Sequence, residues 1–186
     1  MSDKDQVSGL RAIAHPLRLQ ILSLLTGAEM SAAELARELD ITHANASYHL
    51  RVLARAGEVV EAGEEKIRGG VAKRYRHPWD RVVASTPSTT DEDRDLFIRA
   101  TADELVRRFA RRKQGGRNHL TDAEMWVTRE VWDEVTSLVE QASHLIHGEA
   151  KRPRTRGTIH VNMTAAVFEM APAAREESMP TTKEGR

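Results

Sequence analysis

Hydrogen-bonding side chains alternate with small residues over residues 42–49, where the sequence is THANASYH. The aliphatic residues Leu50, Val52 and Leu53 follow directly, which predicts a helix with a small, polar N-terminal half and a buried C-terminal half. Such a helix fits a DNA major groove, about 12 Å wide, with the positive end of its dipole near phosphate. The expected base and phosphate contacts are Thr42, His43, Asn45, Ser47, Tyr48, His49 and Arg51.

A shorter helix must precede this one to hold it in place. Ser31 followed three residues later by Glu34 is typical of a helical N-cap, and Leu35 with Leu39 supplies a buried face. Residues 40–42 then provide a tight turn and the next N-cap. The two helices form a helix-turn-helix, although a generic helical hairpin has the same local pattern.

A glycine-rich hairpin is expected after Gly57, which is placed to end the second helix. One strand starts near Val59, the tip contains residues 69–70, and the return strand ends near Arg76. Cations on such a hairpin suit phosphate contacts, which supply affinity and register rather than sequence selectivity. The expected contacts are Lys66, Arg68, Lys73 and Arg74, and the alternative is a solvated hairpin without a ligand.

Three stretches make the pattern more specific: AHPLRLQILSLL, SAAELARELDI and ASYHLRVLARAG. Together with the basic hairpin they resemble the winged helix-turn-helix of ArsR-type bacterial transcriptional regulators over roughly residues 7–77. The resemblance implies a homodimeric DNA-binding protein, usually a repressor released by a signal. Two departures stand out: the chain has no cysteine, which excludes thiolate metal sensing, and Glu58 occupies a position that is usually apolar.

Length and charge set further bounds. The 186 residues carry 28 Lys and Arg against 28 Asp and Glu, so DNA binding would depend on local basic surfaces rather than on net charge. No apolar run approaches the roughly 20 residues that span a bilayer, and the N-terminus does not resemble a signal peptide. We therefore expect a cytoplasmic protein without membrane contacts or a cofactor.

Two longer helices are expected in the second half, over residues 91–113 and 128–147. The first has an apolar stripe at Ile98, Ala102, Leu105 and Phe109, and the second at Val131, Val135, Leu138, Ala142 and Leu145. Spacings of four and three residues indicate helices that pack against a partner helix. The partner is either the other helix of the same chain or a symmetry mate in a dimer.

Alternating apolar residues predict strands at residues 119–127 and 158–170, paired with each other beside the helices. The predicted fold class is therefore mainly α with small β (α+β), with a winged helix-turn-helix at 7–84, an accessory and dimerisation domain at 91–171, and a disordered tail at 172–186. Trp126, Trp132 and Phe168 could line a cavity for a small-molecule effector, although aromatic residues in such positions more often belong to the core.

Other functions have weaker support. His144 and His147 form an H-x-x-H pair near Glu140 and are candidate metal ligands, but a polar helix face is usually only solvated, and we assign no metal site. The sequence has no G-x-S-x-G, P-loop or H-E-x-x-H motif, so an enzyme is not expected. A protein-docking winged helix is the alternative from another class. The expected partners are double-stranded DNA, a second copy of the chain and a possible small-molecule effector.

Overall fold

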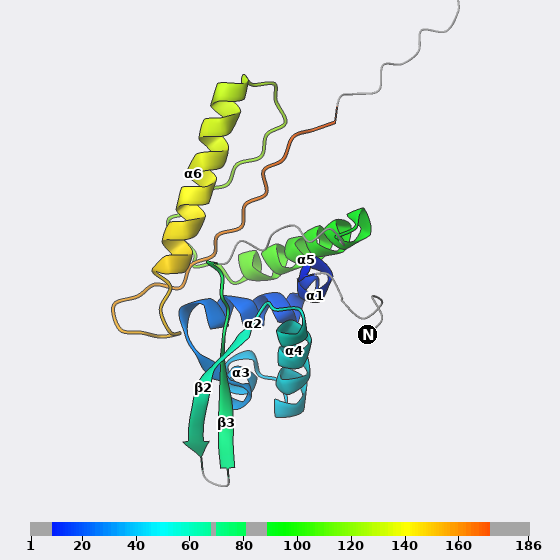
Figure 1. Ribbon diagram of the computed structural model, residues 1–186. Helices are drawn as coiled ribbons and strands as arrows, with labels where there is room; N and C mark the ends of the chain where they lie inside the picture. The colour runs from blue at the N-terminus through cyan, green and yellow to red at the C-terminus, as the bar shows by residue number, and fades with distance from the viewer. Residues whose placement is uncertain (1–8, 68–69, 81–88, 172–186) are drawn as a thin grey trace, which may run out of the picture.

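The computed structural model describes residues 9–67, 70–80 and 89–171. Its helices are α1 (Gly9–Ile13), α2 (Pro16–Gly27), α3 (Ala32–Leu39), α4 (His43–Arg55), α5 (Asp91–Ala110) and α6 (Arg129–Gly148), and its strands are β1 (Met30–Ser31), β2 (Val60–Ile67) and β3 (Gly70–Arg76). Figure 1 shows helices α1–α4 and the β2–β3 hairpin as one body, with α5 lying across α1 and α2. The predicted fold class, mainly α with small β, is confirmed.

The core lies where α2, α3 and α4 meet. Aliphatic side chains from these helices and from β1 are fully buried there: Ile21, Leu25, Met30, Leu35, Leu50 and Leu53. The predicted anchors Leu35, Leu50 and Leu53 are therefore inside, while Leu39 and Val52 are only partly buried. Burying each such side chain contributes about 1.5–3 kcal/mol, which holds α4 firmly against α2 and α3.

Local signals place the helix boundaries as the sequence predicts. The Ser31 side chain accepts a hydrogen bond from the Glu34 amide, and the Glu34 carboxylate accepts one from the Ser31 amide, which completes a capping box. Asp40 ends α3 in the left-handed region at φ 53°, and the Thr42 hydroxyl caps α4 by accepting from the Asn45 amide at 3.2 Å. The turn between the helices is thus specified by neighbouring residues.

The wing is a three-stranded antiparallel sheet in the order β1-β3-β2. Met30 and Ser31 pair with Tyr75 and Arg74, so the hairpin is joined to the segment that starts α3. A register shift between Glu61 and Gly63 bends β2. This bend and the third strand fix the direction of the wing relative to α3.

Helix α5 packs with a different face from the one predicted. Its inward face, against α1 and α2, buries Asp93, Ala100 and Glu104. The apolar stripe that begins at Ile98 faces away and is exposed. The polar inward face is stable because Glu104 is bound by Gln20 of α2 at 2.7 Å and by Arg107 and Arg108 of its own helix.

The predicted strands at residues 119–127 and 158–170 are wrong, because these described residues contain no strand. Both segments run beside α6, which stands apart from α5 as an arm (Figure 1). No hydrogen bond joins the backbone of residues 119–127 or 159–170 to another backbone group in the described part of the chain. Alternating residues define two faces of an extended segment, but a strand also needs a partner, which the chain does not supply here.

The suggested cavity between these segments and α6 is also absent from the described residues. Trp126 is 94% exposed and Phe168 is 66% exposed, so neither encloses a ligand or belongs to a core. The predicted disordered tail at 172–186 lies outside the described residues, as does Arg68 of the wing tip.

Candidate nucleic-acid interface

Helix α4 divides into a buried face and an exposed face. Ala46, His49, Leu50 and Leu53 point inward. The exposed or half-exposed residues are Thr42, His43, Ala44, Asn45, Ser47, Tyr48 and Arg51. This second set contains six of the seven predicted contacts on one surface, with small residues between the hydrogen-bonding ones. A helix surface of this kind can approach base edges closely.

His49 is the predicted contact that the structure does not place on this surface. Its side chain is 7% exposed and its ring centroid lies 4.9 Å from that of His15, the N-cap residue of α2. Burial, together with the charges of His15 and Arg18, lowers the His49 pKa. His49 therefore supports α4 from behind, on the buried face that also carries Ala46 and Leu53.

His15 and Arg18 are residues at this site that sequence reasoning missed. The His15 Nδ1 accepts a hydrogen bond from the Leu17 amide at 3.1 Å, so the ring caps α2 while it contacts the back of α4. Burial, followed by the charge of Arg18, lowers the His15 pKa. In the described part of the chain, the buried Nε of Arg18 and Nδ1 of His49 have no hydrogen-bond partner. Neutral histidines avoid adding further positive charge next to Arg18.

The wing holds acids opposite its cations. Lys73 on β3 forms an ion pair with Glu61 on β2 at 2.7 Å, and Arg74 forms one with Glu65 at 2.6 Å. Lys66 is exposed on β2. Because exposed ion pairs contribute only about 0–1 kcal/mol, a phosphate can replace Glu61 as the partner of Lys73.

Arg74 has a second set of contacts that joins the wing to α3. Its guanidinium also donates to the Glu34 carboxylate at 3.2 Å and to the Glu29 carbonyl, and its side chain is mostly covered. Glu34 thus contacts the N-terminus of α3 and the return strand of the wing together. We assign Arg74 to wing positioning for this reason.

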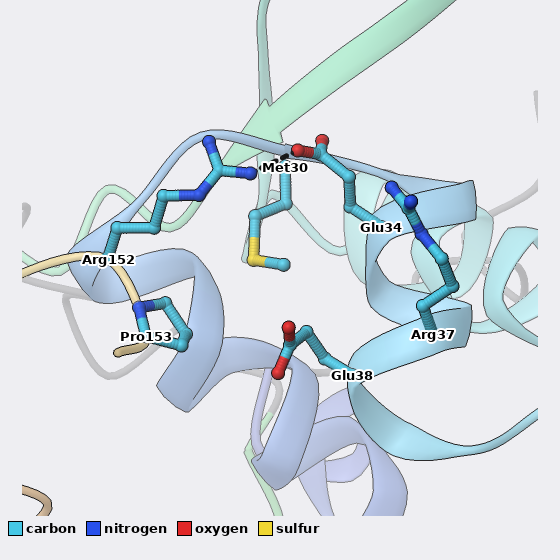
Figure 2. A pocket seen from close by; sticks show the side chains of 6 residues that line it. All are labelled: Met30, Glu34, Arg37, Glu38, Arg152 and Pro153. Atoms are coloured by element: carbon cyan, nitrogen blue, oxygen red, sulfur yellow. Dashed lines mark hydrogen bonds and ion pairs between the residues drawn. The ribbon is translucent and has the colours of Figure 1, made fainter. Parts of the chain in front are cut away.

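Glu34 and Glu38 of α3 also bind the loop that follows α6. Arg152 donates to Glu34, and Arg154 donates to both oxygens of Glu38 at 2.5 and 2.7 Å. Figure 2 shows Arg152 reaching Glu34 across a polar pocket of about 270 Å³ that Met30, Arg37 and Pro153 also line. Burial raises the Glu34 pKa, but hydrogen bonds from Ser31 and Arg152 and the charge of Arg74 outweigh it, so the pKa is lowered overall. The first helix of the motif is therefore tied to the C-terminal region.

Glu58, the unusual residue after Gly57, is buried at 6% exposure. Its backbone amide donates to the Leu53 carbonyl at 2.9 Å, which continues the helix end formed at Gly57 (φ 78°). Burial raises the pKa of the carboxyl group. The backbone thus ends the helix at Gly57 as the sequence predicts, and a carboxyl group is buried where the resemblance implies an apolar side chain.

The base of the arm is a cluster of aromatic and histidine rings. Trp79 contacts His144 and His147 with ring centroids 6.1 and 5.6 Å away, and the His77 Nδ1 lies 3.3 Å from the Thr26 hydroxyl of α2. Both α6 histidines direct Nδ1 toward backbone carbonyls one turn earlier in the helix. Among the described residues, no group of three or more histidine, cysteine or acidic side chains is arranged to hold a metal ion.

Two comparisons with known proteins gave a match. A family model described as a helix-turn-helix domain matches residues 13–60, which run from the end of α1 to the start of β2. A crystal structure of a possible transcriptional regulator for arsenical resistance aligns with 58% of this chain and 99% of its own, at 26% identity and a TM-score of 0.33. None of the curated proteins matches the chain.

Residues 13–60 thus contain a helix-turn-helix domain, and the β2–β3 hairpin follows it as a wing. None of the helices in the described ranges is long and apolar enough to cross a membrane.

Proposed function

We propose that this protein is an ArsR-type DNA-binding transcriptional regulator. It acts as a homodimeric, sequence-specific repressor that binds an inverted-repeat operator and responds to an effector of unidentified class. The observation that carries the proposal is the exposed face of α4, where hydrogen-bonding groups surround Ala44 without large aliphatic residues. A docking surface for protein would instead present apolar anchors at its centre. The uncovered face of α4 has only Tyr48 as a large ring, next to Arg51.

In the proposed complex, α4 enters the major groove with its N-terminal half. Asn45 and Ser47 are the main candidates for base edges, because their side chains are short and lie one helical turn or less from the N-terminus. His43, Tyr48 and Arg51 reach the flanking backbone, and the Thr42 hydroxyl remains the helix cap. His49 and Arg74 support α4 and the wing instead of contacting DNA.

The wing supplies phosphate contacts through Lys66, Arg68 and Lys73. Lys73 exchanges its Glu61 partner for a phosphate, which costs little because both side chains are about half exposed. Half-sites one helical turn apart on one face of the duplex require two α4 helices about 34 Å apart, which two copies of the chain can supply. The homodimer is thus the arrangement that reads an inverted repeat.

Selection of DNA fragments from a random pool by the purified protein tests the proposal. We expect an inverted repeat, bound with an affinity that falls by roughly 10³ between 50 and 200 mM salt if about six phosphates are neutralised. An affinity that does not respond to salt, or a selected pool without a common sequence, contradicts the proposal.

Two variants separate base contacts from backbone contacts. Asn45→Ala should relax preference at one position in each half-site, at a cost of about 1–3 kcal/mol for the preferred base. Lys66→Ala should weaken binding to all sequences alike and reduce the salt slope by about 1 per contact. Arg99→Ala, an exposed cation on α5, is the matched control and should leave both properties unchanged. The reverse pattern for Asn45 and Lys66 would mean that α4 does not read the bases.

A further inference from the structure

Two helices of this chain have an apolar stripe that stays largely exposed among the described residues, although the Arg112 guanidinium lies over the Phe109 ring at 4.1 Å. The large stripe residues of α5 are 39–71% exposed: Ile98, Leu105, Val106 and Phe109. Those of α6 are 39–69% exposed: Val131, Val135, Leu138 and Leu145. Both stripes follow the four-and-three spacing of helices that pack lengthwise, and neither stripe faces its own body. Each helix thus has the surface of a helix–helix seam without the second helix.

The described part of the same chain does not supply the cover. Helix α5 contacts α1 and α2 through its polar face, and α6 projects away from α5 (Figure 1). Residues 1–8, 68–69, 81–88 and 172–186, which lie outside the described ranges, are mostly polar, charged or small. Their larger apolar residues are only Met1, Val7, Val82, Val83 and Met179. Two stripes of this length need a more apolar partner than these segments can offer.

We infer that α5 of one copy packs antiparallel against α6 of a second copy, and that the reciprocal pair forms the other half of a two-fold interface. The inference rests on the homodimer proposed above and names the surfaces that form it. A reciprocal arrangement covers both stripes in both copies, whereas self-pairing of α6 alone leaves α5 uncovered. The interface is isologous, so it closes at two copies.

Charge complementarity sets the antiparallel direction. The C-terminal end of α5 continues into the exposed cations Arg111, Arg112 and Lys113. The first two turns of α6 expose the acids Glu130, Asp133 and Glu134. Within the described ranges, no ion pair joins these two groups. Antiparallel packing brings the basic end of α5 to the acidic start of α6 and also opposes the two helix dipoles.

The area of the stripes is adequate for a stable dimer. The eight large side chains named above are about half exposed, and side chains of this type present on the order of 100–200 Å² each. Roughly 600 Å² of apolar surface per copy is therefore available, before flanking residues are included. A standard interface buries about 800 Å² per partner, which the stripes and their charged borders together provide.

Disulfide trapping tests this packing directly, because the chain contains no cysteine. In the antiparallel pair, Leu105 in the second half of α5 approaches Leu138 in the first half of α6. Copies with Leu105→Cys and copies with Leu138→Cys, distinguished by tags and co-expressed, should give a mixed disulfide after mild oxidation. Ser137→Cys, on the polar face of α6, is the matched control and should give none with Leu105→Cys.

Three results would overturn the inference: Leu138→Cys copies linking mainly to each other, a double variant linking within one chain, or no link although light scattering shows a dimer. The first would establish α6 self-pairing, and the second an intramolecular helix pair. Whichever of these results is obtained, the DNA-selection experiment tests the proposed function independently of the interface. A wild-type protein that selects an inverted repeat but fails to form the mixed disulfide retains the proposed function and loses this interface.

Charge insertion provides a second measurement. Leu138→Asp should raise the dimer dissociation constant by roughly 30-fold or more, as for a central interface residue. Leu105→Asp should have the same effect, since the two residues lie in one seam, and Ser137→Asp should have none. Thermal unfolding by far-UV circular dichroism shows whether each variant folds. A folded Leu138→Asp protein that remains fully dimeric at low micromolar concentration contradicts the inference.

Discussion

Acid should destabilise this protein through His77, which joins the end of the wing to α2 and the arm. The His77 amide donates to the Leu25 carbonyl at 3.1 Å, and its ring lies 3.3 Å from the Thr26 hydroxyl. The Thr26 hydroxyl already donates to the Leu22 carbonyl, so it accepts from Nδ1 of a neutral ring. Burial, and next the charge of His147, lowers the His77 pKa from 6.5 to about 4.

The direction of the effect follows from proton uptake on unfolding. The unfolded chain binds a proton at His77 near pH 6.5, whereas the folded protein keeps the ring neutral until about pH 4. The stabilising contribution is therefore fully present above pH 6.5 and is lost as the pH falls toward 4. Linkage gives a loss of about 2 kcal/mol between pH 7 and pH 5, and of about 3 kcal/mol by pH 4.

Urea unfolding at pH 7, 6 and 5 measures this contribution. His77→Asn keeps a donor near the position of Nδ1 but cannot take up the proton, so the variant should lose about 2 kcal/mol less than the wild type between pH 7 and pH 5. His43→Asn, at an exposed position on α4, is the matched control. A His77→Asn protein with the same pH dependence as the wild type would refute this assignment.

Three further predictions concern Glu58, Glu104 and Gly27. Because burial raises the Glu58 pKa, ionisation of this carboxyl group destabilises the fold as the pH rises. Glu58→Gln should therefore raise the melting temperature at pH 8 but not near pH 4. An equal increase at both pH values would exclude ionisation as the cause. Glu104→Ala removes the buried carboxylate between α2 and α5 and should cost about 2 kcal/mol in urea unfolding, whereas the exposed Asp103→Ala should cost little. A Cβ at Gly27 would lie 2.5 Å from the Lys151 carbonyl oxygen. Gly27→Ala should therefore displace the loop after α6 and increase the rate of tryptic cleavage in that loop. An unchanged cleavage rate would show that this contact does not hold the loop.

The helix-turn-helix was predictable because its signals are local. Ser31 with Glu34 and Thr42 with Asn45 are capping pairs three residues apart, and Leu35, Leu50 and Leu53 lie on faces that helical periodicity defines. His49 shows where this reasoning stops. A histidine is equally suitable for a phosphate or for a buried ring contact, and only the position of His15, which lies 34 residues earlier in the sequence, decides between them.

The wing was predictable as a hairpin but not as a charge arrangement. No acid lies between the cations from Lys66 to Arg76 in the sequence, whereas in the folded hairpin Glu61 and Glu65 of β2 form ion pairs with Lys73 and Arg74 of β3. Register depends on the bulge between Glu61 and Gly63, which sequence alternation does not specify. The ion pairs of these acids with Lys73 and Arg74 could therefore be identified only from the folded hairpin.

The sequence by itself determined the exposed polar surface of α4 between Thr42 and Arg51, since caps, turn and helical period all act within a few residues. Tertiary structure alone decided three features: the burial of His49 behind α4, the attachment of Arg152 and Arg154 to α3, and the outward direction of the α5 and α6 stripes. The physical reason is that periodicity defines the faces of a helix but not which neighbour each face meets. In α5, the face with the buried ion pairs of Glu104 packs against α1 and α2, and the apolar stripe does not. Leu105 therefore stays exposed and can contact a second molecule.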